Sequence, residues 1–201
     1  MDRVPKAAPQ TRVMRYNDGA VFLHWLTAVV VVAQVAVGFA FANMDRGPAR
    51  ASFFTTHKTL GALILVLALI RLAWRLANPP PPYPPELSHW ERIAGVWNHR
   101  LFYILLVALP LTGLLAVSGG ASPQGRTTTP LLGGVPLPLI PGVSDDAGSK
   151  AGSAHIVLVF ITLALLALHI AAAIKHQAER NRAAGRMPPF RAASERAVPR
   201  P

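Results

Sequence analysis

The chain contains no cysteine and few charged residues. None of its 201 residues is a cysteine, which excludes disulfides, thiolate metal sites, iron–sulfur clusters and cofactors attached through thioether bonds. Charged residues make up 14% of the chain and hydrophobic residues 52%, whereas a soluble domain carries roughly 25% charged residues. A water-soluble globular enzyme is therefore not expected.

The chain contains four apolar stretches of about 20 residues each. They cover about residues 20–42, 53–76, 96–117 and 151–174 and contain no Asp or Glu. About 20 apolar residues is the length at which an α-helix crosses a hydrocarbon core of roughly 30 Å. No stretch alternates as a barrel strand does, and a soluble bundle would be left with too little polar surface. The sequence predicts an all-α integral membrane four-helix bundle, running up-down-up-down.

The remaining segments define the predicted organisation. A cytoplasmic N-terminal segment (1–19) precedes the four-helix transmembrane domain (20–176), and a basic cytoplasmic tail (177–201) follows it. A proline run at residues 78–85 is expected to form a stiff spacer. Residues 118–150, rich in Gly, Pro, Ser and Thr, have room for a short lid over the third and fourth helices.

Basic residues predict the orientation. Fifteen Lys and Arg residues lie on the side of the termini and the proline run, and five lie on the other side. Cytoplasmic loops carry the excess, so we expect both termini of a multi-pass membrane protein to lie in the cytoplasm. The first apolar stretch exceeds the 7–15 residues of a cleaved signal peptide, which favours its retention. The excess charge is expected to meet anionic membrane lipid, and nucleic acid is not an expected partner.

Four histidines lie inside the apolar stretches, where ionisable side chains are costly and point to function. His155 and His169 are 14 residues apart on the fourth stretch, which places them on nearly one helix face about 21 Å apart. His24 matches the depth of His169 at the inner level, and His57 matches His155 at the outer level. A single intramembrane histidine is usually a hydrogen-bonding residue. Four at matched depths favour two six-coordinate, non-covalent b haems with two axial imidazoles each.

Other residues are placed to serve these cofactors. Gly38 and Gly113 each lie 14 residues after an inner-level histidine, and Gly61 lies one turn after His57. A glycine at haem depth lets the helix backbone approach a porphyrin plane. All three are therefore predicted to line the cofactor sites.

Two further polar residues are predicted at the inner level. Arg71 lies 14 residues after His57, and a haem propionate or a quinone headgroup would give its charge a partner. His99 lies slightly nearer the surface, where it could ligate a haem or hydrogen-bond a propionate or quinone.

Several motifs, in this order and spacing, resemble the bacterial cytochrome b561 family over about residues 15–188. They are Leu23-His24-Trp25, Thr56-His57-Lys58, Arg71-Leu72-Ala73-Trp74-Arg75, Ala108-Leu109-Pro110-Leu111-Thr112-Gly113, Leu168 to His176, and Arg186-Met187-Pro188. The resemblance implies a four-helix membrane protein with two b haems and quinone-linked electron transfer. It assigns His24 and His169 to the inner haem and His57 and His155 to the outer haem.

The resemblance leaves two functions open. Some family members are superoxide oxidases, which implies an oxidoreductase that passes electrons from an outer-face donor, superoxide, to ubiquinone. In that case Lys58, next to His57, is the expected catalytic cation that attracts the donor. The alternative is a cytochrome b anchor subunit of a respiratory dehydrogenase or hydrogenase, which receives electrons from a redox partner protein and passes them to quinone.

Overall fold

The computed structural model describes residues 15–121, 125–179, 183 and 186–188. Four long helices dominate this part of the chain: α1 (Asp18–Ala42), α2 (Pro48–Ala77), α3 (His89–Gly119) and α4 (Asp145–Ala178). All four are long and apolar enough to cross a membrane, which confirms the predicted all-α membrane bundle. Residues 1–14 and most of the predicted tail lie outside the described residues.

Polar caps extend the helices beyond the apolar stretches. α3 begins seven residues and α4 six residues before the predicted spans. The side chain of Asn17 accepts from the Ala20 amide at 2.8 Å at the start of α1, and Ser88 and Glu91 form a capping box at the start of α3. Such caps satisfy the free amides of a first turn. The apolar stretches therefore mark the hydrocarbon depth, and the helices continue into the polar regions on either side.

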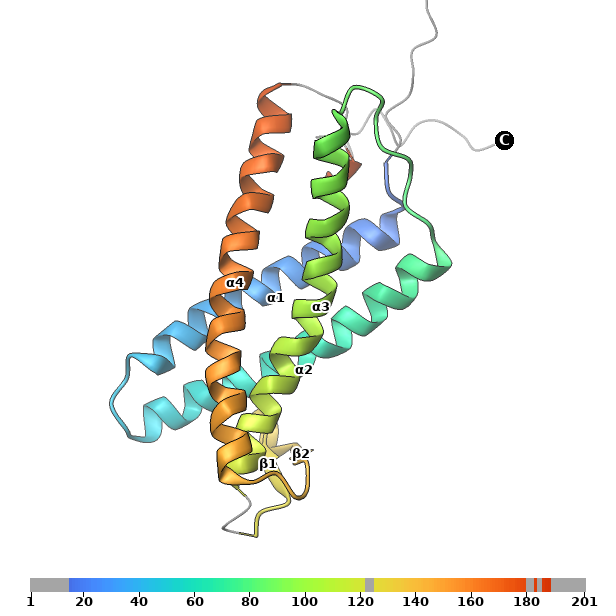
Figure 1. Cartoon of the computed structure of the whole chain (residues 1–201). Helices are drawn as coiled ribbons and strands as arrows, with labels where there is room; N and C mark the ends of the chain where they lie inside the picture. The colour runs from blue at the N-terminus through green and yellow to red at the C-terminus, as the bar shows by residue number, and fades with distance from the viewer. Residues whose placement is uncertain (1–14, 122–124, 180–182, 184–185, 189–201) are drawn as a thin grey trace, which may run out of the picture.

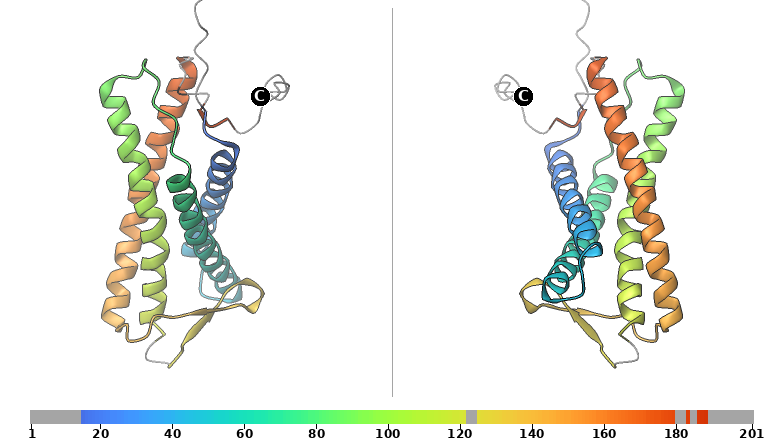
Figure 2. Two further views of the ribbon diagram at one scale, coloured as in Figure 1. Left: turned by 90° about the vertical axis from the view of Figure 1, so that its right-hand side faces the viewer. Right: turned by 90° about the vertical axis from the view of Figure 1, so that its left-hand side faces the viewer.

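Consecutive helices run in opposite directions (Figure 1). α1 lies along α2 and α3 lies along α4, so the bundle consists of two helix pairs that stand side by side (Figure 2) and are inclined to one another (Figure 1). The start of α1, the α2–α3 connection and the end of α4 share one end. The α1–α2 turn and a small hairpin share the other.

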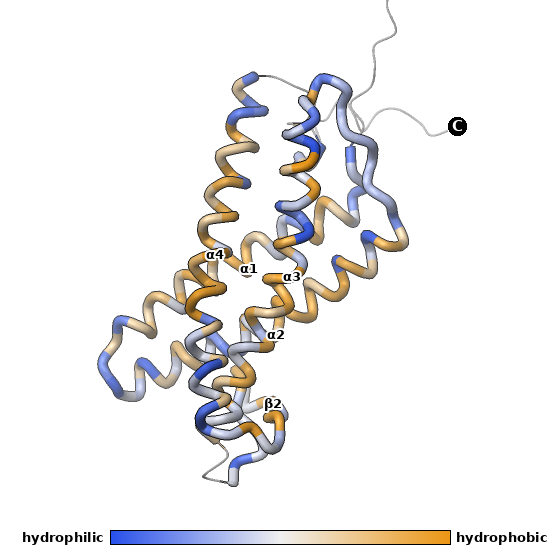
Figure 3. The backbone as a smooth tube through the Cα atoms, viewed as in Figure 1, coloured by the Kyte–Doolittle hydropathy of each residue, from blue (hydrophilic) through white to orange (hydrophobic). Residues whose placement is uncertain are grey.

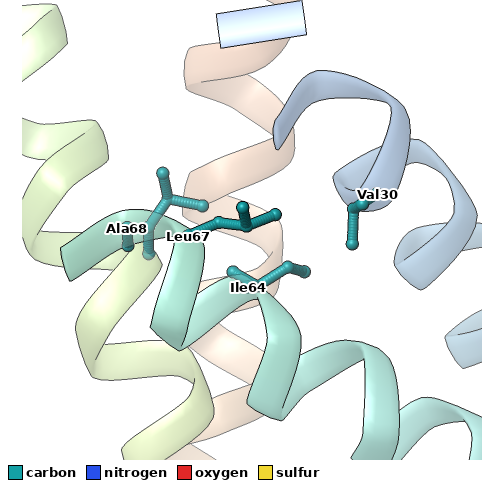
Figure 4. Packing of buried hydrophobic residues seen from close by; sticks show 5 residues of the cluster. Val30, Ile64, Leu67 and Ala68 are labelled. Atoms are coloured by element: carbon teal, nitrogen blue, oxygen red, sulfur yellow. The ribbon is translucent and has the colours of Figure 1, made fainter. Parts of the chain in front are cut away.

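The buried core is small and joins the two pairs. It contains Val30, Ile64, Leu67, Ala68 and Leu106 from α1, α2 and α3 (Figure 4). Large apolar side chains instead face outwards: Val29 is 65%, Phe160 61% and Leu168 65% exposed. Hydrophobic residues are concentrated along the middle of the helices, and hydrophilic residues lie near their ends (Figure 3). This pattern suits a lipid surround, since lipid tails are as apolar as these side chains.

Small residues let α3 and α4 approach closely at the hairpin end. A Cβ on Gly119 would lie 2.6 Å from the Cα of Gly148, so neither position has room for a side chain. Close backbone approach at small residues is a usual means of packing helices in membranes.

The long connection before α4 forms a hairpin that extends towards α2. Strands β1 (Thr128–Pro130) and β2 (Pro136–Pro138) pair antiparallel around the short helix η2 (Leu132–Gly134). The Lys58 ammonium donates to Thr129 Oγ1 at 2.5 Å, and the Leu132 amide donates to Thr59 Oγ1 at 2.9 Å. The expected lid over the third and fourth helices is thus anchored on the second, because α2 supplies these hydrogen-bonding partners.

Candidate functional site

The four intramembrane histidines meet in two pairs. The rings of His24 on α1 and His169 on α4 have centroids 6.2 Å apart, and we call them the inner pair. His57 on α2 and His155 on α4 form the outer pair, also with centroids 6.2 Å apart. The pairs match those predicted from the sequence, and the outer pair lies at the hairpin end.

The spacing within each pair suits one metal ion between two imidazoles. A bond from a metal to an imidazole nitrogen is about 2 Å, so two rings that bind an ion from opposite sides have centroids about 6 Å apart. Within the described residues, no group of three or more His, Cys, Asp or Glu side chains could hold a metal. An ion held by either pair would need its remaining ligands from a cofactor, as haem iron does.

The two nitrogens of each of these histidine rings differ in their contacts. One nitrogen of each histidine contacts a polar group, and the other has no hydrogen bond to the described residues. At His57 the second nitrogen, Nδ1, is buried without a partner. A histidine that ligates a metal donates its other N–H to an acceptor. His155 does so with the Leu109 carbonyl, whereas the partners of His24, His57 and His169 are N–H groups. The contact of His155 and the 6.2 Å spacing of both pairs fit haem.

Each outer histidine rests on a glycine of the neighbouring helix. A Cβ on Gly38 of α1 would lie 3.1 Å from Cε1 of His57, and one on Gly113 of α3 would lie 3.4 Å from Cε1 of His155. Both distances are tighter than most real Cβ contacts. The structure therefore places these two predicted glycines against the outer imidazoles.

His155 is oriented by α3. Its Nδ1 lies 2.9 Å from the Leu109 carbonyl and 3.2 Å from Thr112 Oγ1. Since a carbonyl only accepts, Nδ1 carries the proton and donates it, which leaves Nε2 as the nitrogen with a free lone pair.

Gln34 is a site residue that the sequence analysis missed. Its Nε2 lies 3.2 Å from Nε2 of His57, and its Oε1 is buried without a hydrogen-bond partner. Gly61 lies against this amide, because a Cβ there would be 3.5 Å from Gln34 Nε2. A lone carboxamide in an apolar stretch was the available signal.

The inner pair has a cationic and more polar setting. Arg71 Nη2 lies 2.7 Å from His24 Nδ1, and the amide nitrogen of Asn98, a second residue that the sequence analysis missed, lies 3.2 Å from His169 Nδ1. His99 contacts His169 edge-on, with centroids 5.7 Å apart, and its Nδ1 donates to the Gly95 carbonyl at 2.6 Å. The structure thus brings the predicted Arg71 and His99 to the inner level.

A small cavity opens beside Arg71 at the end where α1 begins. Arg71 and Arg75 both lie over the Tyr103 ring, at 5.9 and 5.8 Å from its centroid, and neither forms a salt bridge with the described carboxylates. The cavity is lined by Tyr16, Ala20, Arg71, Trp74, Arg75, Asn78, Tyr103 and Met187. Two guanidinium groups that have no carboxylate partner among the described residues are suited to bind an anion.

Contacts of Arg186 connect the segments at this end of the bundle. The buried Arg186 lies between the rings of Tyr16 and Tyr83, 5.4 and 4.9 Å from their centroids, and hydrogen-bonds the Pro81 carbonyl. Burial raises the pKa of the Tyr83 phenol, so the ring stays neutral and the contact is a cation–π interaction. The motif Arg186-Met187-Pro188 and the proline run therefore hold one another.

The Lys58 side chain is not freely exposed to solvent. Its side chain is half-buried under the hairpin, where Nζ donates to Thr129 Oγ1 and lies 5.2 Å from the Phe54 ring centroid. The charge stays at the hairpin end beside His57, but the hairpin covers it. A contact between residues 71 positions apart leaves no periodic signal in the sequence.

Comparisons with known proteins agree with this arrangement. The prokaryotic cytochrome b561 family profile matches residues 15–189. The chain is 29% identical over 172 residues to cytochrome b561 homolog 2 of Escherichia coli (strain K12), covering 81% of this chain and 84% of that protein. It is 25% identical over 169 residues to a probable superoxide oxidase, CybB, of Yersinia pestis, covering 81% and 88%. Four membrane-spanning helices and this match show that the chain belongs to the prokaryotic cytochrome b561 family, whose members are b-type haem proteins of membrane electron transfer, and that it is a multi-pass protein of the bacterial inner membrane.

Proposed function

We propose that the protein carries electrons across the membrane through two non-covalent b haems. His24 and His169 would ligate the inner haem, and His57 and His155 the outer haem. The observation that carries this proposal is the equal centroid separation of the two pairs, 6.2 Å in each. Bound haem would supply reversible one-electron chemistry at each pair.

The residues around the inner pair support a propionate site. Arg71 and Arg75 bring two guanidinium groups to the cavity near His24, and both lie over the Tyr103 ring. The carboxylates of haem propionates would neutralise this charge and gain charge-assisted hydrogen bonds. His99 donates its Nδ1 proton to the Gly95 carbonyl and lies beside His169, so its other nitrogen would be available to a propionate of the inner haem.

The spacing of the pairs suits transfer across the bilayer. His155 and His169 are 14 residues apart on α4, a rise of about 21 Å. The hydrocarbon core is about 30 Å thick, so the two levels divide it into shorter steps. The excess of basic residues, fifteen against five, supports a cytoplasmic position for the termini and the inner pair. A reporter that works only in the cytoplasm should be active when it is fused after residue 201. Activity of a periplasmic reporter at that position would show that the proposed orientation is wrong.

Superoxide and a quinone, such as ubiquinone, are the proposed substrates. Two superoxide anions would give up one electron each and leave as dioxygen, and one quinone would take both electrons and two protons to become a quinol. The similarity to the probable superoxide oxidase of Yersinia pestis supports the donor. Lys58 supplies positive charge beside the outer pair, which would raise the local concentration of an anion.

Stopped-flow mixing of the oxidised, haem-loaded protein with superoxide tests the proposal. We expect reduction of the haem bands to outpace spontaneous dismutation, and to slow several-fold in Lys58→Met with a weaker dependence on salt. Arg100→Met, at the opposite end of the bundle, is the matched control. If neither haem is reduced faster than dismutation removes superoxide, the oxidase function is wrong. The anchor-subunit alternative then predicts reduction by a redox partner protein.

A further inference from the structure

The hairpin before α4 is an uncharged, apolar segment at the end of the bundle where the helices become polar. Residues 127–144 contain no charged side chain, and Arg126 and Asp145 bound them on either side. Seven of these residues are Leu, Ile or Val, and four are proline. Contiguous exposed apolar residues mark a surface that meets another molecule or a membrane.

The tip of the hairpin, which we define as residues 131–135, exposes apolar side chains. Leu132 is 49% and Val135 56% exposed. The hairpin extends from the α3–α4 pair past α2 (Figure 2). The tip therefore lies at the side of the bundle and does not fill the space between the helices.

The tip is level with the apolar span of α2. The Leu132 amide donates to Thr59 Oγ1 at 2.9 Å, and Thr59 lies six residues inside the apolar stretch 53–76, about 9 Å along the helix. Leu63 and Val66, four and seven residues after Thr59, share its helix face and are 42% and 52% exposed. The exposed surface of the tip therefore continues the face of α2 that meets lipid.

The backbone of the hairpin suits a surrounding that is poor in water. Within the tip, the Leu131 amide donates to the Val135 carbonyl at 2.8 Å, and the Gly134 amide donates to the Leu131 carbonyl at 3.1 Å. The prolines at positions 130, 136, 138 and 141 have no amide hydrogen. Backbone donors without partners are costly next to acyl chains, so these bonds and missing donors lower the cost of leaving water.

We propose that the tip of the hairpin is a membrane anchor: Leu132 and Val135 insert into the phospholipid leaflet at the hairpin end of the bundle, where headgroups meet acyl chains. Interfacial segments bury their apolar side about 5–10 Å at this boundary. Since the Lys58 ammonium donates to Thr129 on β1, a tip held in lipid would also keep the hairpin over this cation. The proposal depends neither on haem ligation nor on which leaflet is cytoplasmic.

Single-cysteine labelling tests this contact, because the natural chain has no cysteine. Leu132→Cys, Val135→Cys, Leu63→Cys and Thr128→Cys would each be made in the full-length, haem-loaded protein and placed in phospholipid nanodiscs, which leave both faces of the bilayer open to solvent. Mass spectrometry would follow the reaction of each thiol with a charged, water-soluble maleimide and with uncharged N-ethylmaleimide. The ratio of the two rates cancels differences in intrinsic thiol reactivity.

Two of the variants calibrate the ratio. Leu63→Cys reports a lipid-facing position, and Thr128→Cys reports an exposed position on β1 at the far end from the tip. We expect Leu132→Cys and Val135→Cys to favour N-ethylmaleimide about tenfold more than Thr128→Cys does, since burial of one leucine-sized side chain corresponds to roughly tenfold or more in partitioning. Haem content equal to that of the unaltered protein would confirm that each variant is folded.

The unaltered protein allows a measurement that needs no substitution. A phospholipid with a diazirine on its acyl chain should, on illumination, attach to the peptide that spans residues 127–143 as well as to peptides of the four helices. Labelled helices with an unlabelled hairpin would overturn the inference, and so would a tip variant whose rate ratio equals that of Thr128→Cys. Slow reaction of the tip with both reagents, in a protein that elutes as a dimer, would assign the tip to a second copy of the chain and overturn it too.

Discussion

The outer and inner histidine pairs have the same separation but different surroundings. The outer imidazoles contact glycines, an amide and a backbone carbonyl, and the hairpin is anchored beside them. The inner imidazoles contact Arg71, Asn98 and His99, next to a cavity with a second guanidinium group. The comparison separates what both sites need, two opposed imidazoles, from what distinguishes them. The inner site carries positive charge that suits an anionic group. The outer site is closely packed, and the hairpin lies beside it.

The largest expected effect comes from breaking one pair at a time. His57→Ala should remove the outer haem and His24→Ala the inner haem, each with about half of the haem absorbance, because the pairs share no ligand. Spectra of the purified variants, with protein determined separately, would show this. A protein that loses both haems in either variant would contradict two independent sites.

Removing positive charge should affect the inner site alone. Arg71→Leu removes a guanidinium group from the inner level, and we expect the affinity for the inner haem to fall about 10–100-fold, since a hydrogen bond to a charged propionate would contribute about 1.5–3 kcal/mol. Competition with a haem-binding acceptor protein would measure it. Arg100→Leu, whose guanidinium lies over the Trp97 ring at 5.3 Å, is the matched control. Equal losses in the two variants would argue against a specific role for Arg71.

The glycines offer a sharper test of close packing at the outer site. Gly38→Ala places a Cβ 3.1 Å from His57, whereas Gly61→Ala places one 3.5 Å from the Gln34 amide. The first contact requires the imidazole to move by a few tenths of an ångström, and the second is an ordinary van der Waals contact. We expect Gly38→Ala to shift the outer haem spectrum and Gly61→Ala to leave it nearly unchanged. The reverse order would show that the glycines do not position the imidazole.

The smallest effect should come from the hairpin. Thr129→Val removes the acceptor of the Lys58 ammonium. A hydrogen bond to a charged group contributes about 1.5 kcal/mol, so hairpin amides such as that of Leu139 should exchange with deuterium roughly tenfold faster, while both haems remain bound. Thr128→Val, an exposed position on the same strand, should leave the exchange rates unchanged. Similar rates in all three proteins would mean that this contact does not hold the hairpin.

The sequence was sufficient for the helices and the histidine pairs because both follow from periodic signals. Apolar length identifies spans, and a 14-residue step on one helix sets two depths whatever the neighbouring helices do. These arguments predicted that His24 pairs with His169 and that His57 pairs with His155. They also placed Arg71 and His99 at the inner level.

The contacts that the sequence did not reveal arise between helices. Gln34 and Asn98 are single amides with no spacing rule, and their roles emerge only when the partner helices place an imidazole beside each. Gly61, which is predicted to make room for a porphyrin, lies against the Gln34 amide, a neighbour that its sequence position does not reveal. Strands of three residues bounded by proline carry too little alternation to be predicted, and the Lys58–Thr129 contact depends on where the hairpin settles.

The most direct test of this account is the haem content of the intact, purified chain. Haem extracted as its pyridine complex, divided by protein from amino-acid analysis, should give two b haems per chain, both low-spin in the electron paramagnetic resonance spectrum. A ratio of one, with a single low-spin signal, would mean that one of the two matched histidine pairs does not bind haem, and would contradict the central claim.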